Sequence, residues 1–350
     1  MSKAVRNLLV GAAALAGAAV WAVAPRSFGD KRRNFVPAVP ECWYAHRGLH
    51  DAGSGLTQDY AAESGAYVAL ARRMAMKAGY GTPDATGPIA PENSLAAFAA
   101  AAEAGYGIEL DLQLTLDGKV VVVHDADLMR VAGDPRRVED LTYDELTRIP
   151  LFPGARPGDA QAEPLPGAQE RVPLVVTPSK APEGYYQHVP LFIDVLKVVA
   201  GRVPLIVEYK FADDTAWTER DEMLMEEGDA LLQTYDGPYV VESFNPRAIR
   251  WYREHRPEAC RGQLAEAQPV GREHGCDALR LLAGLLAFDW MSRPDFVAYD
   301  WTGGAALQVR AARLMGATAV SWTVCSREEL AQCAPYFDRH IFESFVPDGK

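Results

Sequence analysis

A chain of 350 residues, 49% hydrophobic and 23% charged, is long enough for one large α/β barrel or two ordinary domains and too apolar to be disordered. Its formal net charge of −12 argues against nucleic acid as the main partner, because phosphate backbones select basic surfaces. The five cysteines are odd in number and form no CxxC pattern, which argues against a disulfide framework and a structural zinc site.

The first predicted element is an N-terminal membrane span. Residues 8–24 form an uncharged, alanine-rich run that is just long enough to cross a bilayer, which takes about 17–25 residues. More basic residues follow the run than precede it, and the positive-inside rule then places the rest of the chain on the cytoplasmic side. We therefore expect a membrane anchor over residues 1–25 and a linker over 26–40.

From Pro40 onward the sequence alternates strand-like and helix-like stretches, which is typical of βα units and a parallel sheet. The strand candidates are residues 42–48, 107–115, 119–125, 204–210, 239–244, 261–265, 296–300, 318–324 and 340–345.

One of these candidates is not expected to be a barrel strand. Asp117-Gly118 stands between two alternating apolar stretches, and this pair is a strong hairpin signal, so residues 119–125 should fold back on 107–115. The remaining strands predict an α/β fold, a (β/α)₈ TIM barrel over residues 41–350.

Two segments interrupt the alternation and are expected to be insertions. Residues 51–90 contain a helix-like core at 67–77, which is an ordinary surface helix, a lid, or a basic foot resting on anionic lipid. Residues 151–190 are rich in proline and glycine, and regular structure is disfavoured there.

Ionisable residues stand where the predicted strands end, which in a parallel barrel is the rim that carries the active site. His46 and Arg47 end the first strand, and Glu208 and Lys210 end a later one. On the strand between them, Glu109 and Asp111 are two positions apart, so both carboxylates face the same side.

The predicted hairpin brings a histidine to these carboxylates. A turn centred on Asp117-Gly118 sets position 111 roughly opposite position 124, so His124 should lie beside Asp111. Three carboxylates without cysteine suit a hard divalent cation such as Mg²⁺ or Ca²⁺. Two imidazoles can serve as acid and base, and nearby cations can bind an anion. The set indicates phosphoryl chemistry rather than glycoside hydrolysis, which needs neither a metal nor paired histidines.

The ordered motifs resemble those of the glycerophosphodiester phosphodiesterase family. They are His46-Arg47-Gly48, Pro91-Glu92-Asn93-Ser94, Glu109-Leu110-Asp111, Val122-Val123-His124-Asp125 and Glu208-Tyr209-Lys210, with later similarity at Val241-Glu242-Ser243-Phe244 and Trp322-Thr323-Val324. The N-terminal run and the Ser-Phe ending resemble a membrane-associated bacterial branch of the family.

The resemblance implies an enzyme that hydrolyses glycerophosphodiesters to glycerol 3-phosphate and an alcohol. By matching motif, His46 and His124 would be the acid–base pair, and Glu109, Asp111 and Glu208 would bind the metal. The substrate-binding residues would be Arg47, Lys210, Phe244 and Trp322. Glu92 and Asn93 would begin a helix and brace the site, whereas His50 and the other histidines are expected to be structural.

The sequence departs from the family pattern at three places, which leaves the substrate open. The link between the first two motifs is long, Cys325 replaces an asparagine, and a motif with aspartate near the end reads Phe342-Glu343-Ser344-Phe345. One alternative is phospholipase-D-like cleavage of lysophospholipid headgroups. Another is a catalytically silent membrane-bound barrel that binds rather than cleaves.

Overall fold

The computed structural model describes residues 3–29, 39–85, 87–152, 187–212, 216–267 and 278–348. Most of the predicted insertion at 151–190 thus lies outside the described residues. The chain divides into two compact units. Unit 1 comprises Met1–Val39, Val241–Trp322 and Cys333–Arg339, and unit 2 comprises Pro40–Val240, Thr323–Gln332 and His340–Lys350. The predicted domain and insertion limits are not tested and stay predictions.

Eight strands follow one another in the barrel order β1-β11-β10-β9-β8-β7-β6-β2, and β1 pairs with β2 to close the sheet. The neighbouring pairs within each unit run parallel. The fold is therefore the predicted TIM barrel. The strands are β1 (Trp43–Ala45), β2 (Gly107–Leu114), β6 (Leu205–Tyr209), β7 (Tyr239–Ser243), β8 (Arg261–Ala265), β9 (Phe296–Asp300), β10 (Thr318–Val324) and β11 (Arg339–Phe342).

The predicted hairpin is confirmed, but its register differs from the prediction by one residue. Strand β3 (Val120–Val122) runs antiparallel to β2, with Leu112 opposite Val122. The N–H of Val123 donates to the carbonyl of Asp111, so Asp111 lies opposite Val123 rather than His124. The reason is a three-residue turn in which Gly118 adopts a φ of 72°, instead of the two-residue turn that the sequence suggested.

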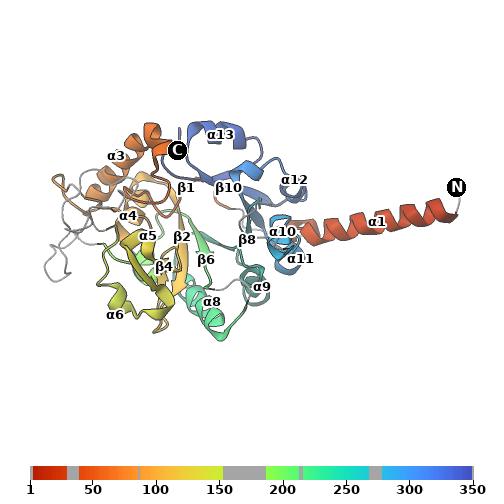
Figure 1. The fold of residues 1–350 in the computed structure, drawn as a ribbon, viewed down its shortest axis with the longest axis horizontal. Coiled ribbons are helices and arrows are strands. Elements are labelled where there is room, and N and C mark those ends of the chain that lie inside the picture. The colour runs from red at the N-terminus through yellow and green to blue at the C-terminus, as the bar shows by residue number, and fades with distance from the viewer. Residues whose placement is uncertain are drawn as a thin grey trace. The chain divides into compact units, whose positions relative to one another are not determined.

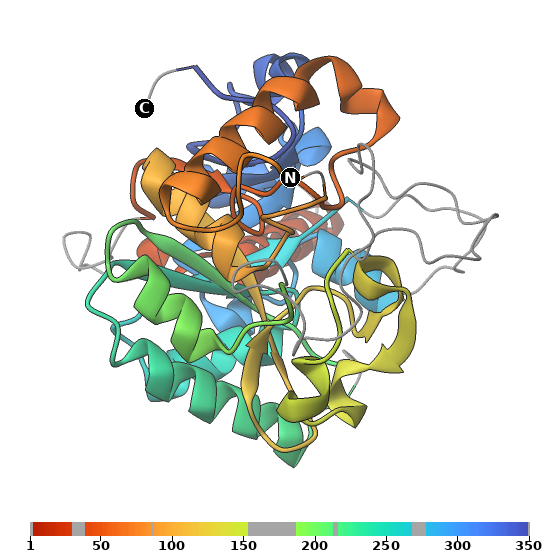
Figure 2. The ribbon, with the colours of Figure 1, turned by 90° about the vertical axis from the view of Figure 1, so that its left-hand side faces the viewer.

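Two helices of unit 2 pack against each other where the predicted insertion at 51–90 meets the barrel. Helix α3 (Ala61–Lys77) lies within the predicted insertion and packs across α4 (Leu95–Ala104), as Figure 2 shows in orange. Alanines line the buried side of α4 and allow this close approach. Ser94 caps the first turn of α4, and Gly105 ends the helix in the left-handed conformation.

The other elements of unit 2 flank the hairpin or follow the strands. They are η1 (Gln58–Tyr60), β4 (Asp127–Leu128), α5 (Met129–Ala132), β5 (Asp134–Arg137), η2 (Val138–Asp140), α6 (Tyr143–Leu146), α7 (Phe192–Val199), α8 (Glu219–Leu232) and most of α13 (Arg327–Cys333). Those of unit 1 are α1 (Lys3–Val23), α2 (Arg26–Gly29), α9 (Pro246–His255), α10 (Ala278–Gly284), α11 (Asp289–Ser292), η4 (Trp301–Gly303) and α12 (Leu307–Leu314).

The last turn of α1 packs on α11 within unit 1, where Figure 1 draws it in red. The ring of Trp21 stacks on that of Trp290 with 5.7 Å between centroids. The guanidinium of Arg293 donates hydrogen bonds to the carbonyl oxygens of Trp21 and Ala24, at 2.8 and 2.7 Å. This end of the helix is therefore a packing element of the unit.

The predicted membrane span over residues 8–24 is wrong. Among the described residues, no helix combines the length and the apolar character that a bilayer crossing requires. Helix α1 carries Lys3 and Arg6, and alanine and glycine dominate the rest of it, so little apolar surface is available for burial in lipid. The cytoplasmic placement and the membrane-associated branch depended on that span and are withdrawn with it.

Candidate active site

Three buried carboxylates meet in unit 2 on the neighbouring strands β2 and β6. The parallel register sets Asp111 beside Glu208, and Glu109 is two positions from Asp111 on the same side of β2. One ligand oxygen from each of the three lies within 4.8 Å of the others. This is the acidic cluster predicted from the sequence, and it could hold a metal ion.

The cluster is only partly neutralised by its neighbours. Nζ of Lys210 lies 2.8 Å from Oε2 of Glu208 and 3.3 Å from Oδ1 of Asp111. The amide of Asn93 donates to Oδ2 of Asp111 at 2.8 Å. Oε1 of Glu208 is buried and accepts no hydrogen bond from the described residues. Burial raises the pKa of Glu208 to about 7, as expected for a carboxylate whose charge lacks a full complement of partners.

Arg47 connects the end of β1 to this cluster. Its backbone N–H donates to Oε2 of Glu109 at 3.0 Å, and its Nε lies 3.5 Å from Oδ2 of Asp111. The chain turns sharply here, with φ of 55° at Arg47 and 83° at Gly48. A Cβ at Gly48 would come within 2.9 Å of Ala97, so glycine is needed for the turn.

His46 lies between the cluster and a fourth carboxylate. Its Nε2 is 3.9 Å from Oε2 of Glu109, whereas its Nδ1 is 2.5 Å from Oε2 of Glu343. Burial, and next to it the charge of Arg47, lower the pKa of His46, although Glu343 acts in the opposite direction. The ring is therefore neutral near pH 7, with its Nδ1 proton on the side of Glu343.

His124 is held in a similar way. Its Nδ1 lies 2.6 Å from Oδ1 of Asp125, whose other oxygen accepts a 2.7 Å hydrogen bond from Nε of Arg130. Burial lowers the pKa of His124 to about 4. The amide of Gln113 lies 2.8 to 3.0 Å from the carbonyl oxygens of Val123, His124 and Asp125, and so fixes the backbone of this segment.

Glu92 lies between two guanidinium groups, that of Arg47, which follows His46 in the chain, and that of Arg130, which contacts Asp125. It is 2% exposed and accepts hydrogen bonds from Arg47 at 2.8 Å and from both terminal nitrogens of Arg130 at 2.6 and 2.9 Å. Burial favours its neutral form, but the two guanidinium groups lower the pKa of Glu92 to about 2. Glu92 therefore fixes two guanidinium groups near the histidines, and its bracing role in the site stays a prediction.

The structure adds residues that sequence reasoning missed. Glu343 was noted only as a departure from a family motif, yet it contacts both His46 and His50, the latter at 3.0 Å. Arg130 and Gln113 belong to no motif. Only the neighbouring histidine motif could have drawn attention to them.

Phe244 and Trp322 lie in unit 1, where their rings meet edge to face with 5.5 Å between centroids. Their assignment to the substrate site stays a prediction. Nε1 of Trp322 is buried and has no hydrogen-bond partner among the described residues.

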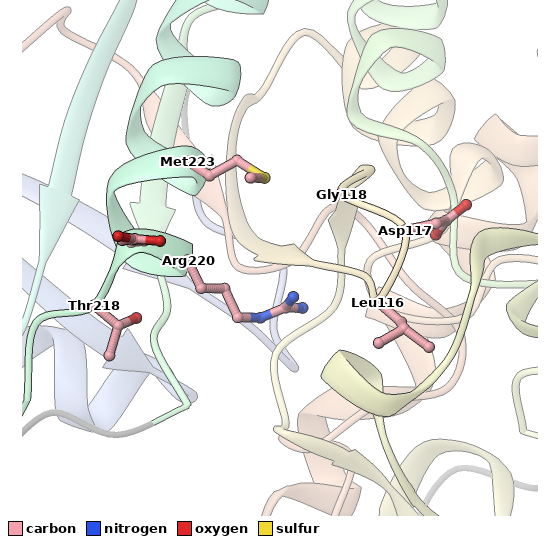
Figure 3. Close-up of a pocket in the computed structure, with 7 residues that line it drawn as sticks. Leu116, Asp117, Gly118, Thr218, Arg220 and Met223 are labelled. Carbon is pink, nitrogen blue, oxygen red and sulfur yellow. The ribbon is translucent and has the colours of Figure 1, made fainter.

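A separate groove of about 730 Å³ opens in unit 2 between the hairpin tip and the start of α8 (Figure 3). The side chain of Arg220 spans it toward the hairpin and donates to the carbonyl oxygens of Leu114 and Thr115. No residue predicted for the active site lines this groove, whose walls are Leu116, Asp117, Gly118, Thr218, Glu219, Arg220 and Met223.

Short stretches of the sequence are similar to proteins named glycerophosphodiester phosphodiesterase. A glycerophosphodiester phosphodiesterase of Bacillus altitudinis is 49% identical over 59 residues, which are 17% of this chain and 24% of that protein. Glycerophosphodiester phosphodiesterase 1 of Homo sapiens is 36% identical over 85 residues, 24% of this chain and 26% of that protein. Each alignment spans about a quarter of the relative's length.

A solved structure supports the fold over a longer range. The structure of an Oleispira antarctica phosphodiesterase, in complex with the product sn-glycerol-3-phosphate, matches with a TM-score of 0.55 at 16% identity. The match covers 88% of this chain and 94% of that one. Finally, the model of the glycerophosphoryl diester phosphodiesterase family matches residues 84–336, which is most of the sequence. The chain therefore belongs to the glycerophosphoryl diester phosphodiesterase family.

Proposed function

We propose that this chain hydrolyses glycerophosphodiesters to glycerol 3-phosphate and an alcohol at the carboxylate cluster of unit 2. The observation that carries the proposal is the arrangement of the two histidines. His46 and His124 each have Nδ1 against a carboxylate, at 2.5 and 2.6 Å, which leaves Nε2 of each ring available for proton transfer.

Glu109, Asp111 and Glu208 would hold the divalent metal, Mg²⁺ or Ca²⁺. Their donor set is all oxygen, which suits a hard cation. The buried Oε1 of Glu208 has no hydrogen-bond partner in the part of the chain that the structure describes, and it fits a ligand position. When bound, the cation would neutralise charge on the phosphate and on the group that departs from it. Lys210 lies against two of the three carboxylates and would limit their mutual repulsion before the metal arrives.

The two imidazoles would divide the proton transfers. Hydrolysis breaks the bond between phosphorus and the alcohol oxygen and forms a bond between phosphorus and an incoming hydroxyl oxygen. One ring takes the proton of the incoming hydroxyl, and the other gives a proton to the departing oxygen. Because both rings are neutral near pH 7, the ring that serves as acid takes up its proton as the anionic substrate binds.

The cations beside the cluster support an anionic substrate. Arg47 and Lys210 would contact the phosphate, with Arg47 held in place by Glu92. Phe244 and Trp322 are proposed as apolar contacts for the rest of the substrate.

A single assay tests the proposal against its alternatives. The full chain is incubated with glycerophosphocholine or lysophosphatidylcholine, with EDTA or with added Mg²⁺ or Ca²⁺. Release of glycerol 3-phosphate that requires the metal supports the proposal. Release of lysophosphatidic acid would instead support the lysophospholipid alternative, and no product under any metal condition would support the silent barrel.

The histidine and metal roles are tested in the same assay with His46→Ala and Glu208→Ala. Each substitution should abolish turnover while circular dichroism stays that of the wild type. Full turnover by a folded variant of either kind would refute the role proposed for that residue.

A further inference from the structure

Each of the two histidines begins a chain of polar contacts, and one short loop contacts the far end of both chains. His46 leads to Glu343, and His124 leads through Asp125 and Arg130 to Glu92. Glu343 and Glu92 are thus the far ends of these two chains of contacts, the His46 arm and the His124 arm. The loop that contacts both is Gly53-Ser54-Gly55, in the segment predicted as the first insertion.

The loop donates one backbone hydrogen bond to each carboxylate. The N–H of Gly55 donates to Oε1 of Glu343 at 2.5 Å, and the N–H of Ser54 donates to Oε2 of Glu92 at 2.7 Å. The hydroxyl of Ser344 donates to the carbonyl of Gly55 at 2.5 Å, which holds the loop from the other side. Two consecutive amides therefore each bind one of the two carboxylates.

The loop has no room for a side chain at either glycine. A Cβ on Gly55 would lie 2.4 Å from Cδ of Glu343, and a Cβ on Gly53 would lie 2.5 Å from Cε1 of His50 and 2.8 Å from Oε2 of Glu92. Both glycines are buried. The close approach of the backbone to Glu343 at Gly55, and to the His50 ring and Glu92 at Gly53, is the reason that glycine occupies these positions.

The two ends of the insertion are tied together, which fixes where the loop can lie. Asp51 is 2% exposed, and its two oxygens accept hydrogen bonds from the N–H groups of Ile89 and Ala90, both at 2.9 Å. Arg72 of α3 adds an ion pair to Asp51 at 2.6 Å. The insertion is thus closed at its base, and Gly53–Gly55 follow directly from that closure.

We propose that the Gly53–Gly55 loop is a positioning element that orients His46 through Glu343 and His124 through Glu92. The inference rests on the proposed acid–base roles of the two histidines. It assigns the insertion a function beside the catalytic groups. The loop fixes Glu343, which contacts His46, and Glu92, which holds the Arg130 that contacts Asp125.

The test replaces Gly55 by alanine and uses Gly65→Ala as the matched control. Gly65 lies in α3 of the same insertion, is exposed and has nothing within 4 Å of its added Cβ. With glycerophosphocholine and saturating Mg²⁺, Gly55→Ala should lower kcat about 10- to 100-fold and change KM less than about twofold, because misplacement by about 1 Å slows chemistry on that scale. Gly65→Ala should keep both constants.

A second readout does not depend on turnover. The proton in the short contact between His46 and Glu343 should give a far-downfield proton resonance, assigned by its loss in His46→Ala. Gly55→Ala should shift or remove this resonance, and Gly65→Ala should leave it in place. A wild-type kcat with an unmoved resonance in Gly55→Ala would overturn the inference. Full activity of His46→Ala would instead refute the proposed function, and the resonance would still report on the loop.

A compensating change guards against misfolding. Glu343→Asp shortens the side chain by one methylene and makes room for the new Cβ, so the losses of Gly55→Ala and Glu343→Asp should not multiply in the double variant. If Gly55→Ala fails to fold, recovery of folding by Glu343→Asp supports the contact. Failure to recover counts against it.

Discussion

Nδ1 of His46 lies 2.5 Å from Oε2 of Glu343, although 297 positions separate the two residues in the chain. Because a carboxylate accepts and does not donate, this contact assigns the proton to Nδ1 and leaves Nε2 to face Glu109. His124 has the same relationship with Asp125, its neighbour in the sequence. The site thus contains two carboxylate–imidazole pairs of similar geometry, one formed by distant residues and one by adjacent residues.

Glu343→Gln should lower kcat about 100-fold or more with little change in KM. The amide keeps the size of the side chain but can present an N–H to Nδ1, which would favour the wrong tautomer of His46. Initial rates over a range of glycerophosphocholine concentrations measure both constants. Glu328→Gln, at an exposed position, serves as the control. Unchanged kcat in a folded Glu343→Gln variant would show that the contact does not set the state of the ring.

Removal of a carboxylate from the cluster should weaken metal binding, whereas removal of an acidic residue elsewhere should not. Glu208→Ala should weaken Mg²⁺ or Ca²⁺ binding at least 100-fold by titration calorimetry, because it removes one of three carboxylates that lie within 4.8 Å. Glu227→Ala removes an exposed carboxylate of α8 and should bind the metal as the wild type does. Equal affinities for the two variants would mean that the metal binds elsewhere.

The sequence was sufficient for the barrel and for the acidic cluster because both follow from short-range rules. Alternation of strands and helices predicted the parallel barrel, and the two-residue spacing of Glu109 and Asp111 predicted that both carboxylates face one side. The closeness of Glu208 then follows from parallel pairing of β2 with β6, which the barrel topology supplies.

Other features depend on contacts that no local pattern reveals. Glu343 meets His46 only because the last strand, β11, pairs with the first strand, β1. The register at the hairpin depends on whether its turn has two or three residues, a difference that Asp117-Gly118 alone does not decide. The membrane span was inferred from the absence of charge in residues 8–24. Absence of charge did not distinguish an alanine-rich helix with one end packed on protein from a segment apolar enough to span a bilayer.

Arg130 should matter for the His124 arm because its planar guanidinium bridges Asp125 and Glu92. Arg130→Lys keeps the charge but loses the fork that makes these contacts together, so kcat should fall about 10-fold. Arg136→Lys is the control, since Arg136 is half exposed and its ion pair with Asp134 lies at the surface. If Arg130→Lys turned over at the wild-type rate, the Arg130 contacts would not be needed, and Asp125 alone would hold His124.

Glu92 should give the protein a stability contribution that depends on pH with a defined sign. The folded state lowers its pKa to about 2, below the unfolded value of about 4.3, so the ionised form is favoured by folding. The contribution is present in full above about pH 5 and declines as the pH falls toward 2. For a buried group, such a shift corresponds to about 3 kcal/mol at neutral pH, and roughly half of it should be gone by pH 3.

Urea unfolding of the wild type and Glu92→Gln at several pH values between 3 and 7 measures this contribution. Glutamine does not titrate, so the difference in unfolding free energy between the two proteins should be constant from about pH 5 to 7 and shrink below that range. Because the loss follows protonation of one carboxylate, the unfolding free energy of the wild type should fall more steeply with decreasing pH than that of Glu92→Gln. A difference that stays equal at pH 3 and pH 7 would mean that the ionisation of Glu92 is not coupled to folding, and that Arg47 and Arg130 are held mainly by their other contacts.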